Sequence, residues 1–201
     1  MTDIEVFKAT YGFRDQDILM VPYGSQVYGT ARPDSDEDYM GIVLLDRDCT
    51  GQEYCHNRLN VHLYGHRDFQ RQLLIHKIHA LEAWFLPDSP CQGRFTFKLN
   101  LHNLRESISE KASHSWVKAK KKFEIERDYL IGQKSLFHSL RILMFGTQVG
   151  QEGRIVDYSV ANQHWRDIIE CGQYQWEYYE NKYKPIYNSL ATEFRKVAPK
   201  E

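Results

Sequence analysis

The 201-residue sequence predicts an α+β protein, with a small N-terminal α/β module followed by a helical half. Two observations support this division. Before residue 65, short apolar runs alternate with turn residues, as in a module built from strands. After residue 65, apolar residues recur at helical spacing, with breaks at 86–93 and 150–154. We therefore expect a first domain over 1–90 and a helical second domain over 91–201.

Three apolar runs predict the strands of the first domain, and they occupy residues 17–24, 39–45 and 58–65. In the last run, Leu59, Val61 and Leu63 share one face, and the polar residues between them share the other. This alternation is typical of a half-buried strand. The helices are expected within 66–85, within a charged stretch over 97–132 that ends at Gly132, and within 133–153 and 157–197.

The composition narrows the function classes. A formal charge of −1 does not indicate bulk attraction to nucleic acid, so any such surface would be a local patch. Aromatic residues make up 13% of the chain. This content favours a packed core, and the alternative use of the rings is in stacking surfaces. The four cysteines form no C-x-x-C pair and predict free thiols. With no signal peptide and no run long enough to span a membrane, we expect a cytoplasmic protein.

The window from Val21 to Leu44 is unusually dense in glycine, hydroxyl and acidic residues for a single turn. A strand that ends at Gly24-Ser25 and turns into a helix would let the backbone approach a ligand closely. The hydroxyl and the first amides of the helix could then hold a phosphate. Further on, Asp36 and Asp38 are two residues apart, so in an extended chain they share a face. Two such carboxylates suit a Mg²⁺ ion that bridges them to a nucleoside triphosphate.

The full pattern reads GSxxYGT…SDxDxxG and ends at Gly41. It resembles the signature of the DNA polymerase β-like nucleotidyltransferase superfamily, in the branch of predicted nucleotidyltransferases found in bacteria and phages. The resemblance covers residues 17–160. It implies a small mixed sheet with flanking helices, followed by a C-terminal helical bundle. It also implies Mg²⁺-dependent (or Mn²⁺-dependent) transfer of a nucleoside monophosphate from an NTP to a hydroxyl of an RNA 3′ end, a protein or a small molecule.

The resemblance assigns roles to individual residues. Asp36 and Asp38 would be catalytic and hold the metal. The nucleotide would be bound by residues of the opening motif and of the helical half, namely Gly24, Ser25, Tyr28, Thr30, Ser35, Lys134, His138 and Arg141. The last three share one helical face, and if that face is directed at the Gly-Ser turn it would hold the outer phosphates.

The superfamily normally supplies a third carboxylate from a neighbouring strand, and here that position is predicted to be Asn60 or His62. Asparagine offers only a neutral oxygen and cannot be a base, whereas His62 could be a catalytic base or a ligand. Acids in the loop before this strand could also substitute, namely Asp46, Asp48 and Glu53. Two functions therefore stay open: an active transferase, or a degenerate fold that binds nucleotide, RNA or protein without turnover.

Two other groups invite a functional interpretation. Lys118 and the lysines at 120–122, near Trp116, form either a solvated surface or a helical RNA-binding face that combines charge with stacking. His76 and His79 are three residues apart, but no cysteine or carboxylate stands at matching spacing. We therefore expect ordinary histidines there and no zinc site.

Overall fold

The computed structural model describes residues 2–46 and 49–200. The chain divides into two compact units, Met1–Lys98 and Leu99–Glu201, whereas the sequence pattern predicted the division between residues 90 and 91. The first unit contains a mixed sheet with flanking helices, and the second is helical, which confirms the predicted α+β fold class.

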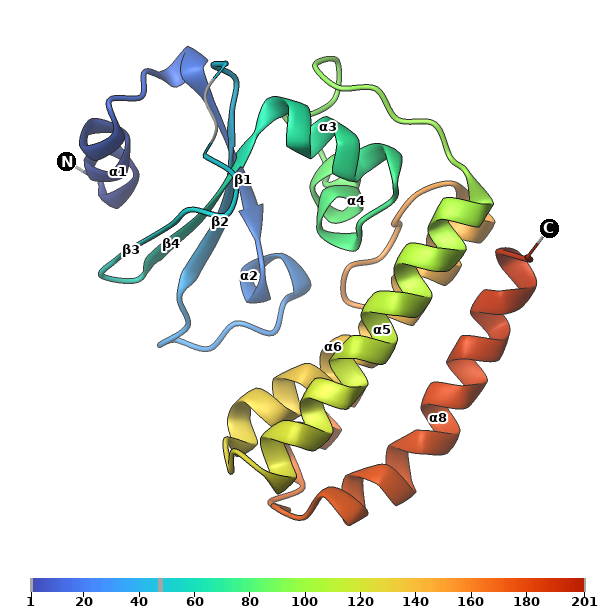
Figure 1. Cartoon of the computed structure of the whole chain (residues 1–201). Helices are drawn as coiled ribbons and strands as arrows, with labels where there is room; N and C mark the ends of the chain where they lie inside the picture. Colours follow the sequence, from blue (N-terminus) through green and yellow to red (C-terminus); the bar gives the residue numbers. More distant parts are fainter. Residues whose placement is uncertain (1, 47–48, 201) are drawn as a thin grey trace. The chain divides into compact units, whose positions relative to one another are not determined.

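In the described residues, the sheet of the first unit has four strands: β1 (Ile18–Tyr23), β2 (Glu37–Val43), β3 (Glu53–His56) and β4 (Leu59–Gly65). Their order is β1-β2-β4-β3, in which β2 and β4 run parallel and the two outer pairs are antiparallel (Figure 1). Three strands lie where apolar runs predict them, although β2 begins two residues earlier. Strand β3 was not predicted, because it is short and its residues do not alternate between apolar and polar.

One face of the sheet is closed by α1 (Asp3–Tyr11), whose Phe7 is fully buried. The alternating apolar residues of β4 join Phe7 in one core. This core contains Phe7, Phe13, Ile18, Val43, Cys49, Leu59, Val61 and Leu63. Helix α1 starts with a capping box between Thr2 and Glu5, and the short 3-10 helix η1 (Asp15–Asp17) leads on to β1.

The other helices of this unit are α2 (Ser25–Tyr28), α3 (His66–Leu74) and α4 (Ile78–Phe85). The last two fill the predicted 66–85 region, but the helix is interrupted between them. The interruption is centred on His76, whose φ is 58°. Its ring Nδ1 donates to the carbonyl of Leu74 at 2.8 Å, which holds the buried imidazole in the turn.

The second unit consists of α5 (Leu101–Glu124), α6 (Tyr129–Glu152), α7 (Asn162–Glu170) and α8 (Trp176–Val197). Its core is rich in aromatic rings from α5, α6 and α8, including Trp116, Phe123 and Tyr179. The predicted aromatic core is therefore present in this half of the chain.

The predicted helix end at Gly132 is wrong, because α5 ends at Glu124 and α6 begins at Tyr129. The turn between them is formed by Arg127, which has a φ of 57°, and by Asp128, whose side chain accepts from the Ile131 amide at 3.2 Å. Gly132 lies inside α6, where a Cβ would come within 2.7 Å of the Phe123 ring. Glycine serves close helix packing at this position and does not end the helix.

The predicted break at 150–154 also begins too early, because Gly150 still belongs to α6. A Cβ on Gly150 would lie 2.7 Å from Val197 of α8, so this glycine too permits a close helix contact.

In the described chain, no helix is both long and apolar enough to cross a membrane. All four cysteines lie in the described part of the chain, and each is a free thiol.

Candidate functional site

The turn after β1 is built around Gly24, whose φ of 76° and ψ of −151° lie in a region that is essentially restricted to glycine. The carboxylate of Asp38 lies directly against it. A Cβ on Gly24 would come closer than 3.0 Å to Asp38 Oδ2 and would lie 3.1 Å from the Asp38 Cβ. The fold therefore brings the glycine of the motif and its second aspartate into contact.

Strand register determines which side chain lies beside Asp38. Tyr23 is its partner on β1, and Asn60 is its partner on the parallel strand β4. The Asn60 amide Nδ2 donates to Asp38 Oδ1 at 3.4 Å, a long hydrogen bond. Of the two positions considered for the third carboxylate, the one beside Asp38 is thus Asn60.

His62 lies one residue pair further along β4, opposite Met40 of β2 and Glu53 of β3. Its Nδ1 is 3.1 Å from Glu53 Oε1, and both side chains are exposed, at 42% and 62%. Side chains two apart on a strand share a face and are separated by about 6.6 Å. His62 therefore shares the face of Asn60 but stands one row away from Asp38.

Of the acids considered as substitutes, neither Glu53 nor Asp46 lies beside Asp38. Glu53 is on β3, which is separated from β2 by β4, and it faces His62. Asp46 forms an exposed ion pair with Arg67 at 3.2 Å. Asp48 lies outside the described residues.

Asp36 is exposed and directly precedes β2. The loop before it is held through Ser35, whose hydroxyl accepts from the Arg32 amide at 2.8 Å. The Ser35 carbonyl accepts from the guanidinium of Arg58, with Nε at 3.1 Å. Ser35 thus shapes the loop that presents Asp36. No local sequence pattern indicates the part that Arg58 plays.

Two further motif residues support the turn. The Thr30 amide donates to the Ser25 carbonyl at 3.0 Å, which closes the four-residue helix α2. Tyr28 is buried, and its hydroxyl donates to Glu82 Oε2 of α4 at 2.7 Å. Tyr28 therefore anchors α2 to α4. The pairing with Glu82, 54 residues away, could not be inferred from sequence spacing.

Lys134, His138 and Arg141 all lie on α6 in the second unit. Lys134 is exposed, His138 is half-buried, and Arg141 is only 2% exposed. The Arg141 guanidinium donates through Nη2 to His138 Nδ1 at 2.8 Å. Burial lowers the pKa of His138 well below its ordinary value, and the charges of Arg141, Lys111 and Lys118 lower it further. The approach of these residues to the turn at Gly24 stays a prediction.

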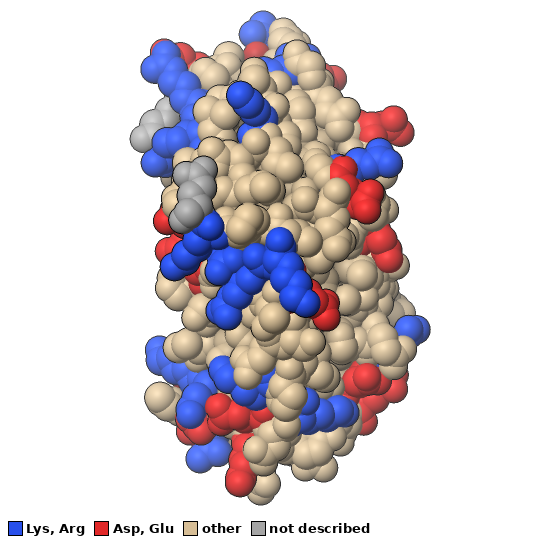
Figure 2. All heavy atoms as spheres, turned by 90° about the vertical axis from the view of Figure 1, so that its right-hand side faces the viewer, with Lys and Arg blue, Asp and Glu red and all other residues tan. Residues whose placement is uncertain are grey.

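The lysine run on α5 is largely compensated by acids. Lys120 pairs with Glu124 at 4.0 Å, and Lys121 and Lys122 pair with Glu126 at 3.1 and 2.6 Å. Trp116 is 6% exposed and packs against Trp176 and Tyr187, so it offers no open stacking surface. Figure 2 shows basic and acidic side chains distributed together over one face of the protein.

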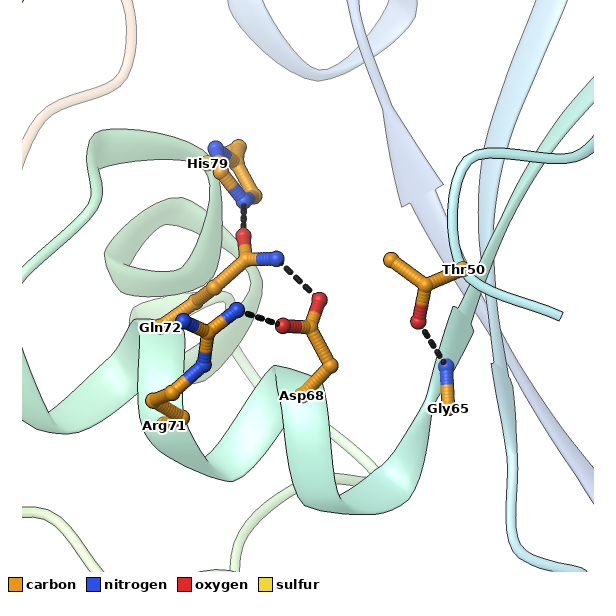
Figure 3. Close-up of polar contacts among 6 residues, drawn as sticks. All are labelled: Thr50, Gly65, Asp68, Arg71, Gln72 and His79. Atoms are coloured by element: carbon orange, nitrogen blue, oxygen red, sulfur yellow. Dashed lines mark hydrogen bonds and ion pairs between the residues drawn. The ribbon is translucent and has the colours of Figure 1, made fainter. Parts of the chain in front are cut away.

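His79 belongs to a polar chain on α3 and α4 (Figure 3). Its Nε2 contacts the side-chain oxygen of Gln72, and the Gln72 amide donates to Asp68, which also accepts from Arg71. The His79 ring stacks on Tyr64 with centroids 5.4 Å apart. Across residues 2–46 and 49–200, no group of three or more His, Cys, Asp or Glu side chains is arranged to hold a metal ion.

Comparison with protein-family models finds no match, and comparison with functionally curated proteins finds none either.

The side chains of Asp36 and Asp38 are possible donors for Mg²⁺. They offer two carboxylate groups, and in the described chain no third acid combines with them into a group that could hold a metal ion. Mg²⁺ in phosphate-transfer sites is commonly held by one or two carboxylates, with waters and substrate phosphates completing the octahedron. By donor type, two carboxylates would suit a Mg²⁺ ion whose coordination shell is completed by a triphosphate, and the described residues form no site that holds an ion with protein ligands alone.

Proposed function

We propose that the first unit is a nucleotidyltransferase, which passes a nucleoside monophosphate from an NTP to an acceptor hydroxyl and releases pyrophosphate. The observation that carries the proposal is the contact of Asp38 with the backbone of Gly24. Because Gly24 has no side chain, the Asp38 carboxylate lies close to the backbone of the turn. A metal ion on this carboxylate would therefore hold a phosphate close to the same backbone. The sequence resemblance to polymerase β-like nucleotidyltransferases supports the same interpretation.

In this proposal, Asp36 and Asp38 would hold Mg²⁺, which neutralises charge that develops on the phosphoryl group. Gly24 leaves room for the Asp38 carboxylate against the backbone of the turn, and the Ser25 hydroxyl would donate to a phosphate oxygen. Tyr28 and Ser35 keep the turn and the loop in place through Glu82 and Arg58. The acceptor hydroxyl would attack the α-phosphorus in line, and the bond to the pyrophosphate oxygen would break.

The proton of the acceptor hydroxyl would be taken by His62. Its Nδ1 faces Glu53, and if that nitrogen carries the ring proton, Nε2 has a free lone pair. This arrangement replaces the third carboxylate by an imidazole oriented by an acid.

A second candidate function is a degenerate transferase fold that binds nucleotide, RNA or protein without turnover. The observation that favours it is Asn60, because a neutral amide stands beside Asp38 where the superfamily has an acid. Loss of one catalytic group commonly reduces the rate by several orders of magnitude.

Incubation with each radiolabelled NTP, Mg²⁺ or Mn²⁺ and candidate acceptors separates the two functions. The enzyme proposal expects pyrophosphate release that Asp36→Asn with Asp38→Asn abolishes. Asp34→Asn with Glu37→Gln is a matched control, since it removes two negative charges from the same window and should retain activity. If the wild type releases no pyrophosphate but binds an NTP by calorimetry through Asp36 and Asp38, the degenerate fold is the correct function.

Asn60→Asp tests the site without requiring turnover. A carboxylate at this position would stand beside Asp38, and the repulsion should lower the melting temperature in EDTA. Mg²⁺ should then raise the melting temperature more in Asn60→Asp than in the wild type, because the ion gains a third ligand. Equal Mg²⁺ responses in both proteins would contradict a metal site at Asp38.

A further inference from the structure

The α5–α6 hairpin carries a cluster of cations that joins Lys118 of the lysine run to residues outside that run. Phe123 packs on Gly132 near the turn, and Ile108 packs on Gly146 further away, so the two helices run antiparallel in close contact. His138 lies on α6 between these two contacts. It therefore lies level with the middle of α5, the part of the helix that holds Lys111 and Lys118, whose charges act on its ring.

Lys111 and Lys118 differ from the other lysines of α5 in their surroundings. Both are exposed, and neither forms an ion pair in the part of the chain that the structure describes. On a helix the neighbours of a side chain are three and four residues away, and no such position around Lys111 or Lys118 is acidic. Their positive charge is therefore not neutralised locally.

The two lysines share one face of α5. They are seven residues apart, which is about two helical turns or 10.5 Å. The exposed His114 lies between them at the spacing that keeps it on the same face.

His138 and Arg141 add to this cluster from α6. Because Arg141 donates to His138 Nδ1, a neutral His138 ring carries its proton on Nε2. This N–H has no protein acceptor in the described residues, and the His138 side chain is partly exposed. The three groups whose charges act on the ring are all cations, namely Arg141, Lys111 and Lys118. One imidazole N–H and three positive charges therefore gather where the two helices meet.

We propose that Lys111, Lys118 and the His138 Nε2–H form a binding site for phosphate groups, with the buried Arg141 holding the His138 ring in place. Lysine ammonium groups and an imidazole N–H are donors that match phosphate oxygens. The site lies within the second unit and requires neither Asp36 nor Asp38. Its test is therefore independent of the test of the proposed function. A nucleoside triphosphate and a single-stranded oligonucleotide are two sources of the same phosphate chemistry.

The test measures binding of fluorescein-labelled 12-nucleotide RNA and of ATP to the full chain at several salt concentrations. Lys111→Gln with Lys118→Gln should weaken binding about tenfold, and for RNA it should reduce the slope of log K against log salt by about 1.4, since two phosphate contacts are lost. Lys120→Gln with Lys121→Gln is the matched control, because it removes the same charge from the same helix. Its lysines are already paired with acids, so it should change affinity less than twofold.

Preferential binding of RNA would identify a nucleic acid backbone as the ligand, and preferential binding of ATP would identify a free triphosphate. Either result with the expected difference between the two double variants supports the site. Equal losses in both variants, or no binding of either probe by the wild type, would overturn it. As a second measurement, the NMR signals of the His138 ring should shift on addition of the bound probe, and unchanged signals would also refute the proposal.

Discussion

Replacing Gly24 by alanine tests the close contact on which the candidate site depends. The backbone there has φ 76° and ψ −151°, and a non-glycine residue in such a region costs about 1–3 kcal/mol. The added Cβ would also press against the Asp38 carboxylate at less than 3.0 Å, and forcing atoms into occupied space typically costs about 1–3 kcal/mol more. We expect Gly24→Ala to lower the free energy of unfolding by about 3 kcal/mol.

Urea denaturation followed by circular dichroism measures this loss, and two variants separate its causes. Gly12→Ala also places alanine at positive φ, but in the αL region and with no atom within 4 Å of its Cβ, so it gives a lower bound for the backbone strain at Gly24. Asp38→Ala removes the carboxylate that the added Cβ would meet, so Gly24→Ala should cost at least about 1 kcal/mol less in that background. If the cost is the same with and without the Asp38 carboxylate, the inferred contact is wrong.

Two more predictions concern the second unit. Gly132→Ala should destabilise the protein by about 1–3 kcal/mol in thermal melts, despite the better helix propensity of alanine, because its Cβ would overlap the Phe123 ring; Phe123→Leu in the same protein should recover part of the loss. For His138, burial lowers the pKa of the folded protein below that of the unfolded chain. As the pH falls below about 6.5, the imidazole therefore binds a proton in the unfolded chain before it does so in the folded protein, and the protein loses stability. His138→Gln should therefore lose less stability than the wild type between pH 7 and pH 5.5 in urea titrations, and an unchanged loss would contradict the burial of this imidazole.

Local sequence patterns predicted much of this fold, and the errors have identifiable causes. The alternation of Leu59, Val61 and Leu63 located β4 and its buried face. Helix α1 was missed although Thr2 and Glu5 carry the spacing of a capping box. Gly132 was taken for a helix end because close contact with Phe123, nine residues earlier across a turn, is a property of the folded hairpin and leaves no local signal.

Only those parts of the candidate site that depend on local sequence patterns were predictable. The motif around Gly24 and Asp38 has a local pattern, and the register of β4 follows from its alternation. The support of Tyr28 by Glu82 joins distant segments, so no spacing rule finds it. The unpaired Lys111 and Lys118 could have been recognised, because Lys120 has Glu124 four residues on and these two lysines have no acid at that spacing.

Packing of Leu59, Val61 and Leu63 on one face of the sheet determines which residues stand beside Asp38 on the opposite face. A shift of β4 by one residue would turn Leu59, Val61 and Leu63 out of the core and expose them to water, so the register that pairs Asn60 with Asp38 is strongly fixed. Strand β4 contains no acidic residue, and Glu53 on β3 is two strand spacings, about 9.5 Å, from β2. No slip of these strands therefore brings a third carboxylate to Asp38. Any catalysis at this site has to work with Asn60 beside Asp38, which makes the Glu53–His62 pair the nearest alternative source of a base on the same sheet face.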